Sequence, residues 1–332
     1  MKKQLIVFVL ILGVLALFQQ SCRVKQPVSN SVKDPSSFSL AFYNLENLFD
    51  TIDDPAINDE EFLPGSKKEW NSERYNHKLN RLAQVIDSLQ PGSNGILGVC
   101  EFENESVLSD LNKRLNGAYQ IYTVPSPDAR GIDVGLLLKG NVEHLELIHK
   151  SYVFIDEPDM RTRNLQISRV NWNGNMLLVA VCHMPSRRGG QEASAGKRIQ
   201  VAQQVRGALD SLLKVYPQAY SVVMGDMNDE PSDSSMQVLK ASSIQPMLNL
   251  MDGIHAAKEG SYLYKGKWDC LDQILIGSAM NKLGSWTPLV YKRDWMLEQE
   301  GKYAGSPWRT FAGNKYLGGY SDHLPVIVTW KP

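Results

Sequence analysis

The chain has 332 residues, of which 43% are hydrophobic, and its 35 basic and 36 acidic side chains give a net charge of −1. This composition is that of an ordinary globular protein and excludes a disordered or fibrous chain. The near-neutral balance argues against a broad basic surface that would hold long duplex nucleic acid, although a small basic groove stays open.

The N-terminus has the three-part layout of a secretory signal. Lys2 and Lys3 precede an apolar stretch, residues 5–18, and small or polar residues then lead to Cys22. The apolar stretch is shorter than the roughly 20 residues that a membrane-spanning helix needs. Residues 1–22 are therefore predicted to be a signal peptide rather than an uncleaved anchor. A cysteine at this point resembles a bacterial lipoprotein signal, which implies an exported protein held at a membrane by a lipid on Cys22.

The rest of the chain is predicted to form one domain, residues 38–332, which follows a polar tether with Pro and Ser, residues 23–37. No linker, low-complexity segment or repeat interrupts the sequence of this domain. Three cysteines remain, Cys100, Cys182 and Cys270, without the CxxC spacing of a metal cluster. Their apolar surroundings indicate core packing, and one disulfide between two of them stays an open alternative.

Helix-like and strand-like segments follow one another along this domain. Three segments place apolar residues on one face of a helix: 70–89, 105–115 and 193–215. Eight segments rich in Val, Ile and Leu and bounded by turn residues are predicted to be strands: 39–43, 95–100, 133–139, 165–172, 175–183, 219–225, 271–277 and 324–330. The mixture of helical connections and hairpins indicates an α/β fold with two packed sheets and helices outside.

The segment GGYSDHLPVIVTW, residues 318–330, places Asp322 and His323 at the start of a strand-like apolar run. A turn is the simpler explanation when such a pair stands alone. Polar residues recur, however, at the ends of other predicted strands: Asn44, Glu101, His183, Asp226 with Asn228, and Asp272. Because α/β folds place ligands at strand ends, these positions together favour a functional site.

The residue types at these positions suit one chemistry. Carboxylate and amide oxygens are the hard donors that Mg²⁺ or Mn²⁺ prefers, and five of the residues supply them: Asn44, Glu101, Asp226, Asn228 and Asp322. A zinc site is disfavoured because neither an HExxH motif nor paired cysteines occur. A carboxylate-held ion beside two histidines suits hydrolysis of a phosphodiester, because the ion neutralises phosphoryl oxygens and an imidazolium donates to the developing oxyanion.

The chain resembles the endonuclease/exonuclease/phosphatase superfamily of deoxyribonuclease-I-like, metal-dependent phosphoesterases. The resemblance rests on a series of motifs in this order: NLENLFD, CEFEN, RGIDVGLLL, CHMPSRRGG, GDMND, LDQILI and SDHLPV. It implies a four-layer α/β/β/α sandwich with two central mixed β-sheets. It also implies that residues 38–332 are the catalytic domain of a Mg²⁺-dependent hydrolase of phosphate esters, with Mn²⁺ as an alternative ion.

The resemblance implies a metal side of the site. Glu101 resembles the principal metal ligand, and Asn44 and Asp322 resemble residues at the same metal. Asp226 resembles the residue that orients or deprotonates the attacking water. Asn228 resembles a contact to the phosphate or the metal.

The resemblance also implies groups that act on the phosphate. His323 resembles the general acid or transition-state donor. Asp272 resembles the partner that holds this imidazole and raises its pKa, as an adjacent carboxylate should. His183 resembles a residue that contacts the phosphate from the opposite side.

Arginines near these motifs are candidate phosphate contacts, because a guanidinium matches phosphate oxygens bidentately. Arg130, Arg163 and Arg187 are predicted to bind the substrate. The alternative for each is a surface ion pair or a solvated loop, which contributes little. Aromatic residues in the stretches 262–268 and 291–308 either stack on a substrate or pack at the edge of the core.

The predicted function is Mg²⁺-dependent hydrolysis of phosphodiesters by an exported, nuclease-like lipoprotein that faces the periplasm or the cell surface and acts as a monomer. A fold does not choose among substrates, so a sphingomyelinase-like or inositol-phosphatase-like enzyme acting on lipid or sugar phosphates stays an alternative. A non-catalytic surface-binding lipoprotein on the same fold is a second alternative. Such a binder is expected to have lost some site residues, and none is missing here.

Overall fold

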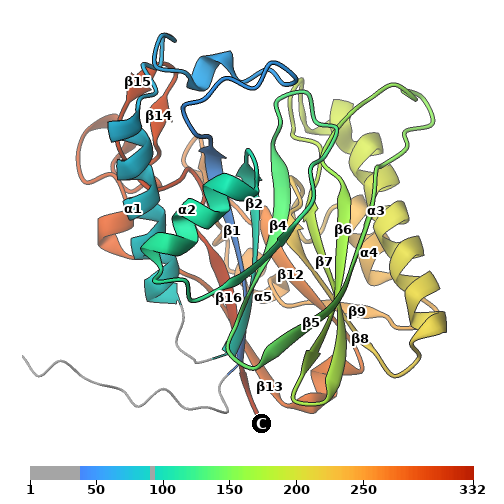
Figure 1. Cartoon of the computed structure of the whole chain (residues 1–332). Helices are drawn as coiled ribbons and strands as arrows, with labels where there is room; N and C mark the ends of the chain where they lie inside the picture. Colours follow the sequence, from blue (N-terminus) through green and yellow to red (C-terminus); the bar gives the residue numbers. More distant parts are fainter. Residues whose placement is uncertain (1–37, 90–93) are drawn as a thin grey trace, which may run out of the picture. The chain divides into compact units, whose positions relative to one another are not determined.

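The computed structural model describes residues 38–89 and 94–332. The predicted signal peptide with Cys22 and the predicted tether, residues 23–37, lie outside the described residues. Two six-stranded β-sheets form the centre of the described part, and helices lie along both of them (Figure 1). No helix in this part combines the length and the hydrophobicity that a bilayer crossing requires.

The first sheet contains one parallel pair of strands among antiparallel neighbours, because β1 runs parallel to β2. The parallel pairing brings the carboxyl ends of β1 and β2, with Asn44 and Glu101, to the same edge of the sheet. In spatial order the strands are β13 (Ser285–Val290), β16 (Val326–Lys331), β1 (Phe38–Leu48), β2 (Asn94–Phe102), β4 (Asp133–Lys139) and β3 (Gln120–Thr123).

The second sheet has the same mixed character, because β7 runs parallel to β8. In this pair His183 lies opposite Asp226, and antiparallel β12 places Asp272 opposite Asp226 on the other side. In spatial order the strands are β5 (Val142–Lys150), β6 (Leu165–Trp172), β7 (Asn175–His183), β8 (Tyr220–Asp226), β12 (Asp272–Gly277) and β9 (Met247–Asn249).

Helices cover the two sheets, and two small hairpins form separate two-stranded sheets. Figure 1 shows α1 and α2 beside β1 and β2, and α3 and α4 beside the second sheet. The helices are α1 (Ser72–Leu89), α2 (Glu105–Arg114), α3 (Gln191–Val215), α4 (Ser234–Lys240) and α5 (Asp252–Ala256), with 3₁₀ turns η1 (Glu60–Phe62), η2 (Met280–Leu283), η3 (Asp294–Met296) and η4 (Gly301–Tyr303). The hairpins are β10 (Tyr262–Tyr264) with β11 (Lys267–Asp269), and β14 (Phe311–Ala312) with β15 (Lys315–Tyr316). This arrangement confirms the predicted α/β class with two mixed sheets.

The central strands of the second sheet are buried on both faces, as β7 illustrates. Leu177 and Val179 belong to the same buried cluster as strand residues of the first sheet. The intervening Leu178 and Ala180 pack in a second cluster with Val205 of α3, because successive side chains of a strand point to opposite faces. Burial on both faces explains why the sequence of β7 is a continuous apolar run.

Two contacts join the sheets directly. The rings of Phe38 in β1 and Trp172 in β6 stack with their centroids 3.9 Å apart. At Gly98 of β2 an added Cβ would lie 2.7 Å from Sδ of Met224 in β8, so only glycine permits this approach without a shift. The two sheets therefore pack face to face.

All eight predicted strands and all three predicted helices are present, with ends that differ by a few residues. Eight strands of the described part were not predicted: β3, β5, β9, β10, β11, β13, β14 and β15. The two longest of these, β5 and β13, are edge strands with many exposed residues, which lack the apolar run that marks a buried strand. Cys100, Cys182 and Cys270 are buried and free. Their predicted role in core packing is confirmed, and no disulfide links these three.

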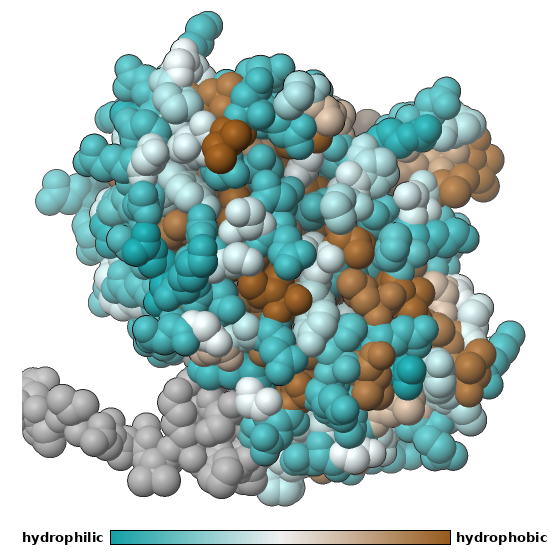
Figure 2. All heavy atoms as spheres, viewed as in Figure 1, coloured by the Kyte–Doolittle hydropathy of each residue, from teal (hydrophilic) through white to brown (hydrophobic). Residues whose placement is uncertain are grey.

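Figure 2 shows one face of the described part, where hydrophilic residues predominate and hydrophobic residues gather in several small groups. The most exposed large hydrophobic side chains of the described residues include Ile52 and Ile155. Scattered apolar residues of this kind are ordinary on a protein surface and do not by themselves mark an interface.

Candidate active site

The strand ends of both sheets border one cleft of about 740 Å³, a volume in the usual range of small-molecule sites. Nine of the eleven predicted site residues line it: Glu101, Arg130, Arg163, His183, Arg187, Asp226, Asn228, Asp322 and His323. The other two, Asn44 and Asp272, are buried and contact lining residues from behind. The structure thus brings together residues that are far apart in the sequence.

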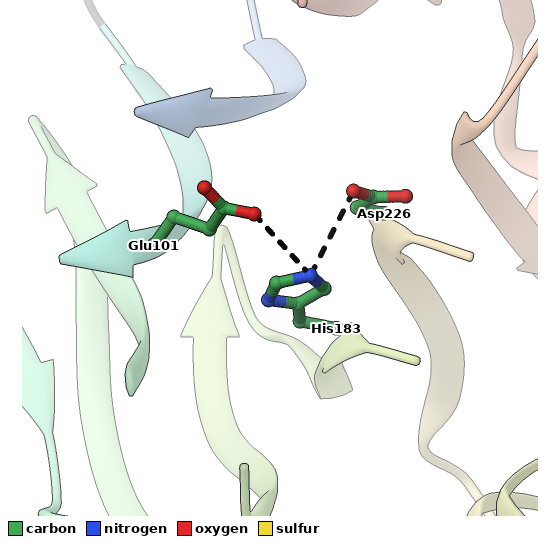
Figure 3. A group of neighbouring side chains, drawn as sticks. All are labelled: Glu101, His183 and Asp226. Atoms are coloured by element: carbon green, nitrogen blue, oxygen red, sulfur yellow. Dashed lines mark ion pairs between the residues drawn. The ribbon is translucent and has the colours of Figure 1, made fainter. Parts of the chain in front are cut away.

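Two carboxylates and one imidazole converge at the centre of the cleft. Figure 3 shows Glu101 of β2 and Asp226 of β8 pointing toward the ring of His183 of β7. Nε2 of His183 lies 3.6 Å from Oε1 of Glu101 and 3.8 Å from Oδ2 of Asp226. The donor atoms of the three residues all lie within 4.8 Å of one another, which is close enough for them to share one ion.

The backbone at Glu101 is strained. Its φ is +60°, in the left-handed region, and the pairing of β2 with β4 shifts register between Cys100 and Phe102. A non-glycine residue in this region costs about 1 kcal/mol or more and persists where the surrounding structure fixes it. The irregularity leaves the side chain of Glu101 partly exposed in the cleft, although most of β2 is buried.

Two asparagines hold the carboxylate of Asp226. Nδ2 of Asn44 donates to Oδ2 over 3.1 Å, and the backbone N–H of Asn228 donates to Oδ1 over 2.9 Å. Oδ1 of Asn44 accepts from the N–H of Glu46 over 2.9 Å. Burial raises the pKa of Asp226 to about 7, with Asp272 and Glu101 adding to the shift against the opposing effect of His323. A pKa near neutrality suits a group that accepts a proton from water.

His323 and Asp272 form a buried pair. Nδ1 of His323 lies 2.6 Å from Oδ2 of Asp272, and Nε2 lies 3.9 Å from Oδ2 of Asp226. Burial opposes a charge on His323, but Asp272 and Asp226 outweigh it and hold the pKa of the imidazole well above its ordinary value. The bond to Asp272 directs Nε2 toward the cleft, so the charged ring can donate a proton there.

His183 differs from His323 in charge. Burial, followed by the charges of Arg163 and Arg130, lowers the pKa of His183 well below its ordinary value. Its Nδ1 is buried and has no hydrogen-bond partner among the described residues. A neutral imidazole offers Nε2 either as an N–H donor to a phosphate oxygen or as a lone pair to a metal ion.

The donor set fits a divalent cation. The ion pairs of Glu101 and Asp226 involve only histidines, so no Lys or Arg charge occupies these carboxylates in the described part of the chain. The two carboxylates suit Mg²⁺ or Mn²⁺, whereas the imidazole is a ligand that zinc and other transition metals also accept. Asp322 lines the same cleft with a half-buried side chain, and Nη2 of Arg309 lies 3.5 Å from its Oδ2.

The three predicted substrate arginines differ in their surroundings. The guanidinium of Arg163 is buried and donates to the carbonyls of His183 and Met184 and to Asp128. Arg187 donates to the carbonyl of Asn228 and to Asp269. These bonds give both a role in holding the loops that carry site residues.

Arg130 keeps more freedom than the other two arginines. Its side chain is 50% exposed, and its Nε lies 3.7 Å from Oδ1 of Asp128. Arg130 also lines the cleft. Of the three, it is therefore the one best placed to meet a phosphate.

Residues that are not among the predicted site residues complete the site. The hydroxyl of Ser261 donates to Oδ2 of Asp272 and accepts from the N–H of the same residue. The ring of Tyr262 packs against His323, with centroids 4.8 Å apart. Glu46, which lies in the NLENLFD motif without an assigned role, is buried in β1 and accepts from the N–H of Thr310 over 2.7 Å. Only the aromatic stretch 262–268 gave a signal in the sequence.

Solved structures share this fold. TDP2 from Caenorhabditis elegans is 12% identical with a TM-score of 0.57, and the match covers 89% of this chain and 74% of that one. The mannosyl-6-phosphatase of Bacteroides thetaiotaomicron is 15% identical with a TM-score of 0.55, covering 88% and 98%. TDP2 from D. rerio, complexed with a single-strand DNA product, is 16% identical with a TM-score of 0.53, covering 90% and 100%. At these identities the likeness establishes the fold alone.

Sequence comparison identifies the family. No curated protein matches this chain. A family model described as the endonuclease/exonuclease/phosphatase family matches residues 39–331, nearly the whole described part. The chain therefore belongs to the endonuclease/exonuclease/phosphatase family of phosphoesterases.

Proposed function

We propose that the protein hydrolyses phosphate esters with the help of Mg²⁺ or Mn²⁺. The observation that carries the proposal is the cluster of Glu101, His183 and Asp226 in one cleft with the charged His323. A divalent ion bound there would neutralise the phosphoryl oxygens. Glu101 would be the main ligand of this ion. Asn44 and Asp322 are proposed as further residues at the same metal.

The chain's own residues have complementary tasks in this reaction. Asp226 orients the attacking water and takes its proton, since Asn44 and Asn228 fix both of its oxygens. Nε2 of His323 donates to the oxygen of the leaving alcohol or to the phosphoryl oxyanion. Asp272 holds the other ring nitrogen, and this charge-assisted bond keeps the ring oriented and protonated.

The charges in the cleft favour a small substrate over a nucleic-acid strand. Arg163, Arg187 and Lys267 line the cleft but are each paired with a carboxylate. Arg130 keeps only a 3.7 Å contact and is half exposed. One available cation suits a single phosphate group, whereas a strand needs a series of them. We therefore place a sugar phosphate, the substrate class named for the Bacteroides thetaiotaomicron relative, ahead of the nuclease-like activity that the sequence favoured.

We also propose that the mature protein is attached to a membrane through a lipid on Cys22 and faces the periplasm or the cell surface. The three-part layout of residues 1–22 supports this proposal. We further propose that it acts as a monomer. Neither proposal affects the chemistry of the cleft.

A substrate panel tests the function. The full-length protein is assayed with Mg²⁺ against mannose 6-phosphate, bis-p-nitrophenyl phosphate and single-stranded DNA, and again with excess chelator. We expect hydrolysis that the chelator stops, and faster turnover of mannose 6-phosphate than of DNA. Undiminished activity in excess chelator would refute the proposed dependence on a metal ion. Faster cleavage of DNA would refute the charge argument, and inactivity toward every substrate would favour a binding protein.

A further inference from the structure

The hairpin of β10 and β11 lies beside the proposed proton donor. Tyr262 of β10 and His323 form a backbone β-bridge, and the N–H of Leu324 donates to the carbonyl of Ser261 over 2.7 Å. Ser261 also binds Asp272 through its hydroxyl. The start of the hairpin is therefore attached to both members of the His323–Asp272 pair, which fixes its position over that side of the cleft.

One face of this hairpin presents two aromatic rings. Tyr262 and Tyr264 are two residues apart on β10, so their side chains point to the same face. Both line the cleft. The ring of Tyr262 is tilted by 36° against the ring of His323. Tyr264, in contrast, is 54% exposed. Tyr264 therefore has an aromatic surface that no protein group fully covers.

The hairpin carries two lysines, of which only Lys267 lines the cleft, and Nζ of the other, Lys265, lies 5.2 Å from the centre of the Tyr264 ring. Nζ of Lys267 lies 3.0 Å from Oε1 of Glu230 and 3.1 Å from Oδ1 of Asp269. The part of the hairpin that lines the cleft, with two aromatic rings and one paired lysine, is poorly suited to bind a second phosphate. It suits an uncharged ring, which stacks on the face of an aromatic side chain.

We infer that Tyr264 binds the leaving alcohol of the substrate, and that this alcohol carries an uncharged ring, either the sugar of a sugar phosphate or a nucleoside. The inference rests on the proposed function, and on the first of its two roles for His323, in which Nε2 gives its proton to the oxygen of the leaving alcohol. The leaving group must then lie beside His323, where the ring of Tyr262 packs against the imidazole and Tyr264 lines the same cleft. Tyr264 is a specificity residue in this scheme and takes no part in proton transfer.

Steady-state kinetics with three monoesters test the inference. Mannose 6-phosphate and adenosine 5′-monophosphate carry a ring on the leaving group, and glycerol 3-phosphate has none. Tyr264→Ala should lower kcat/KM for at least one ring-bearing ester, relative to glycerol 3-phosphate, by about tenfold, the size of one stacking contact. The loss should lie mainly in KM, because stacking binds ground state and transition state alike. The two ring-bearing esters distinguish a sugar from a nucleoside.

Two further variants control the experiment. Tyr264→Phe keeps the ring and should retain the preference for ring-bearing esters. Tyr303→Ala removes a similarly exposed tyrosine, 57% exposed, that does not line the cleft, and should change nothing. Equal loss on all three esters, or no loss, would overturn the inference, as would a wild type that cleaves only phosphodiesters. A wild type inactive on every phosphate ester would instead overturn the proposed function.

Discussion

Replacing Lys78 by Met tests how a buried cation supports the site. The side chain of Lys78 projects from α1 and is 0% exposed. Its Nζ donates to the carbonyl of Glu46 over 3.0 Å, and to Thr310 Oγ1 and the Tyr320 carbonyl over 2.6 and 3.3 Å. Three acceptors use all three N–H groups of an ammonium. Oε2 of Glu46 lies 3.7 Å away, so Lys78 also balances this buried carboxylate.

The expected cost of Lys78→Met follows from these contacts. Met keeps most of the aliphatic volume but leaves the carboxylate of Glu46 without its counter-ion, and the two carbonyls and the Thr310 hydroxyl without their donor. Removing one member of a buried ion pair typically costs about 3–5 kcal/mol. Each kcal/mol lowers Tm by about 2–4 °C in domains of 150–250 residues. We therefore expect the free energy of unfolding to fall by about 3–5 kcal/mol and Tm by roughly 10 °C.

Urea and thermal unfolding at pH 8 measure this loss. The pH matters because burial, with the charge of Asp322 adding to it, raises the pKa of Glu46 to about 7, and the carboxylate must be ionised. Adding Glu46→Gln removes the stranded charge but keeps an acceptor for Thr310, so it should recover part of the loss. Lys113→Met, at a side chain that is 76% exposed, should change stability by less than about 0.5 kcal/mol. A cost below about 1 kcal/mol for Lys78→Met, or no recovery in the double variant, would refute this reasoning.

Four further predictions concern the site, the pH dependence of stability and the N-terminus. Glu101→Gln should abolish Mg²⁺-dependent hydrolysis with the far-UV circular dichroism unchanged, whereas Glu105→Gln, at an exposed position nearby, should keep it; an active Glu101→Gln would contradict the metal site. His323→Ala should lower kcat by about 10²- to 10⁴-fold and Asp272→Asn by less; the double variant should be little worse than His323→Ala, and multiplying losses would disprove the pairing. Burial raises the pKa of Asp133 to about 7 from 3.8, so the folded state binds this proton more tightly than the unfolded state. Stability should then fall as the pH rises from about 4 to 7, by a few kcal/mol at about 1.4 kcal/mol per pKa unit. Urea unfolding of Asp133→Asn should lack this part of the decline, and an identical pH profile in the variant would contradict the shift. Cys22→Ser should release the protein from membranes in fractionated bacterial cells, and unchanged membrane association without a detectable lipid would contradict the lipoprotein proposal.

The sequence by itself determined the order of the main elements and the positions of the reactive residues along them. Strands buried on both faces, such as β7, read as continuous apolar runs, and this pattern is local. Polar residues that end such runs, such as Asn44, Glu101 and Asp226, could therefore be selected before any contact was known. Lys78 also had a local signal, since it falls on the apolar face of α1 three residues after Tyr75 and four before Leu82.

Only the tertiary structure decided which partner each polar group has. Arg163 and Arg130 look alike in the sequence, but one is bound to backbone carbonyls and the other is half exposed in the cleft. Asn44 donates a hydrogen bond to Asp226, which lies 182 residues further along the sequence. The physical reason is that periodicity fixes the face of a strand or helix, whereas a hydrogen bond depends on how separate sheets and loops pack. That packing placed the ring of Tyr262 against His323 and brought Tyr264 into the same cleft.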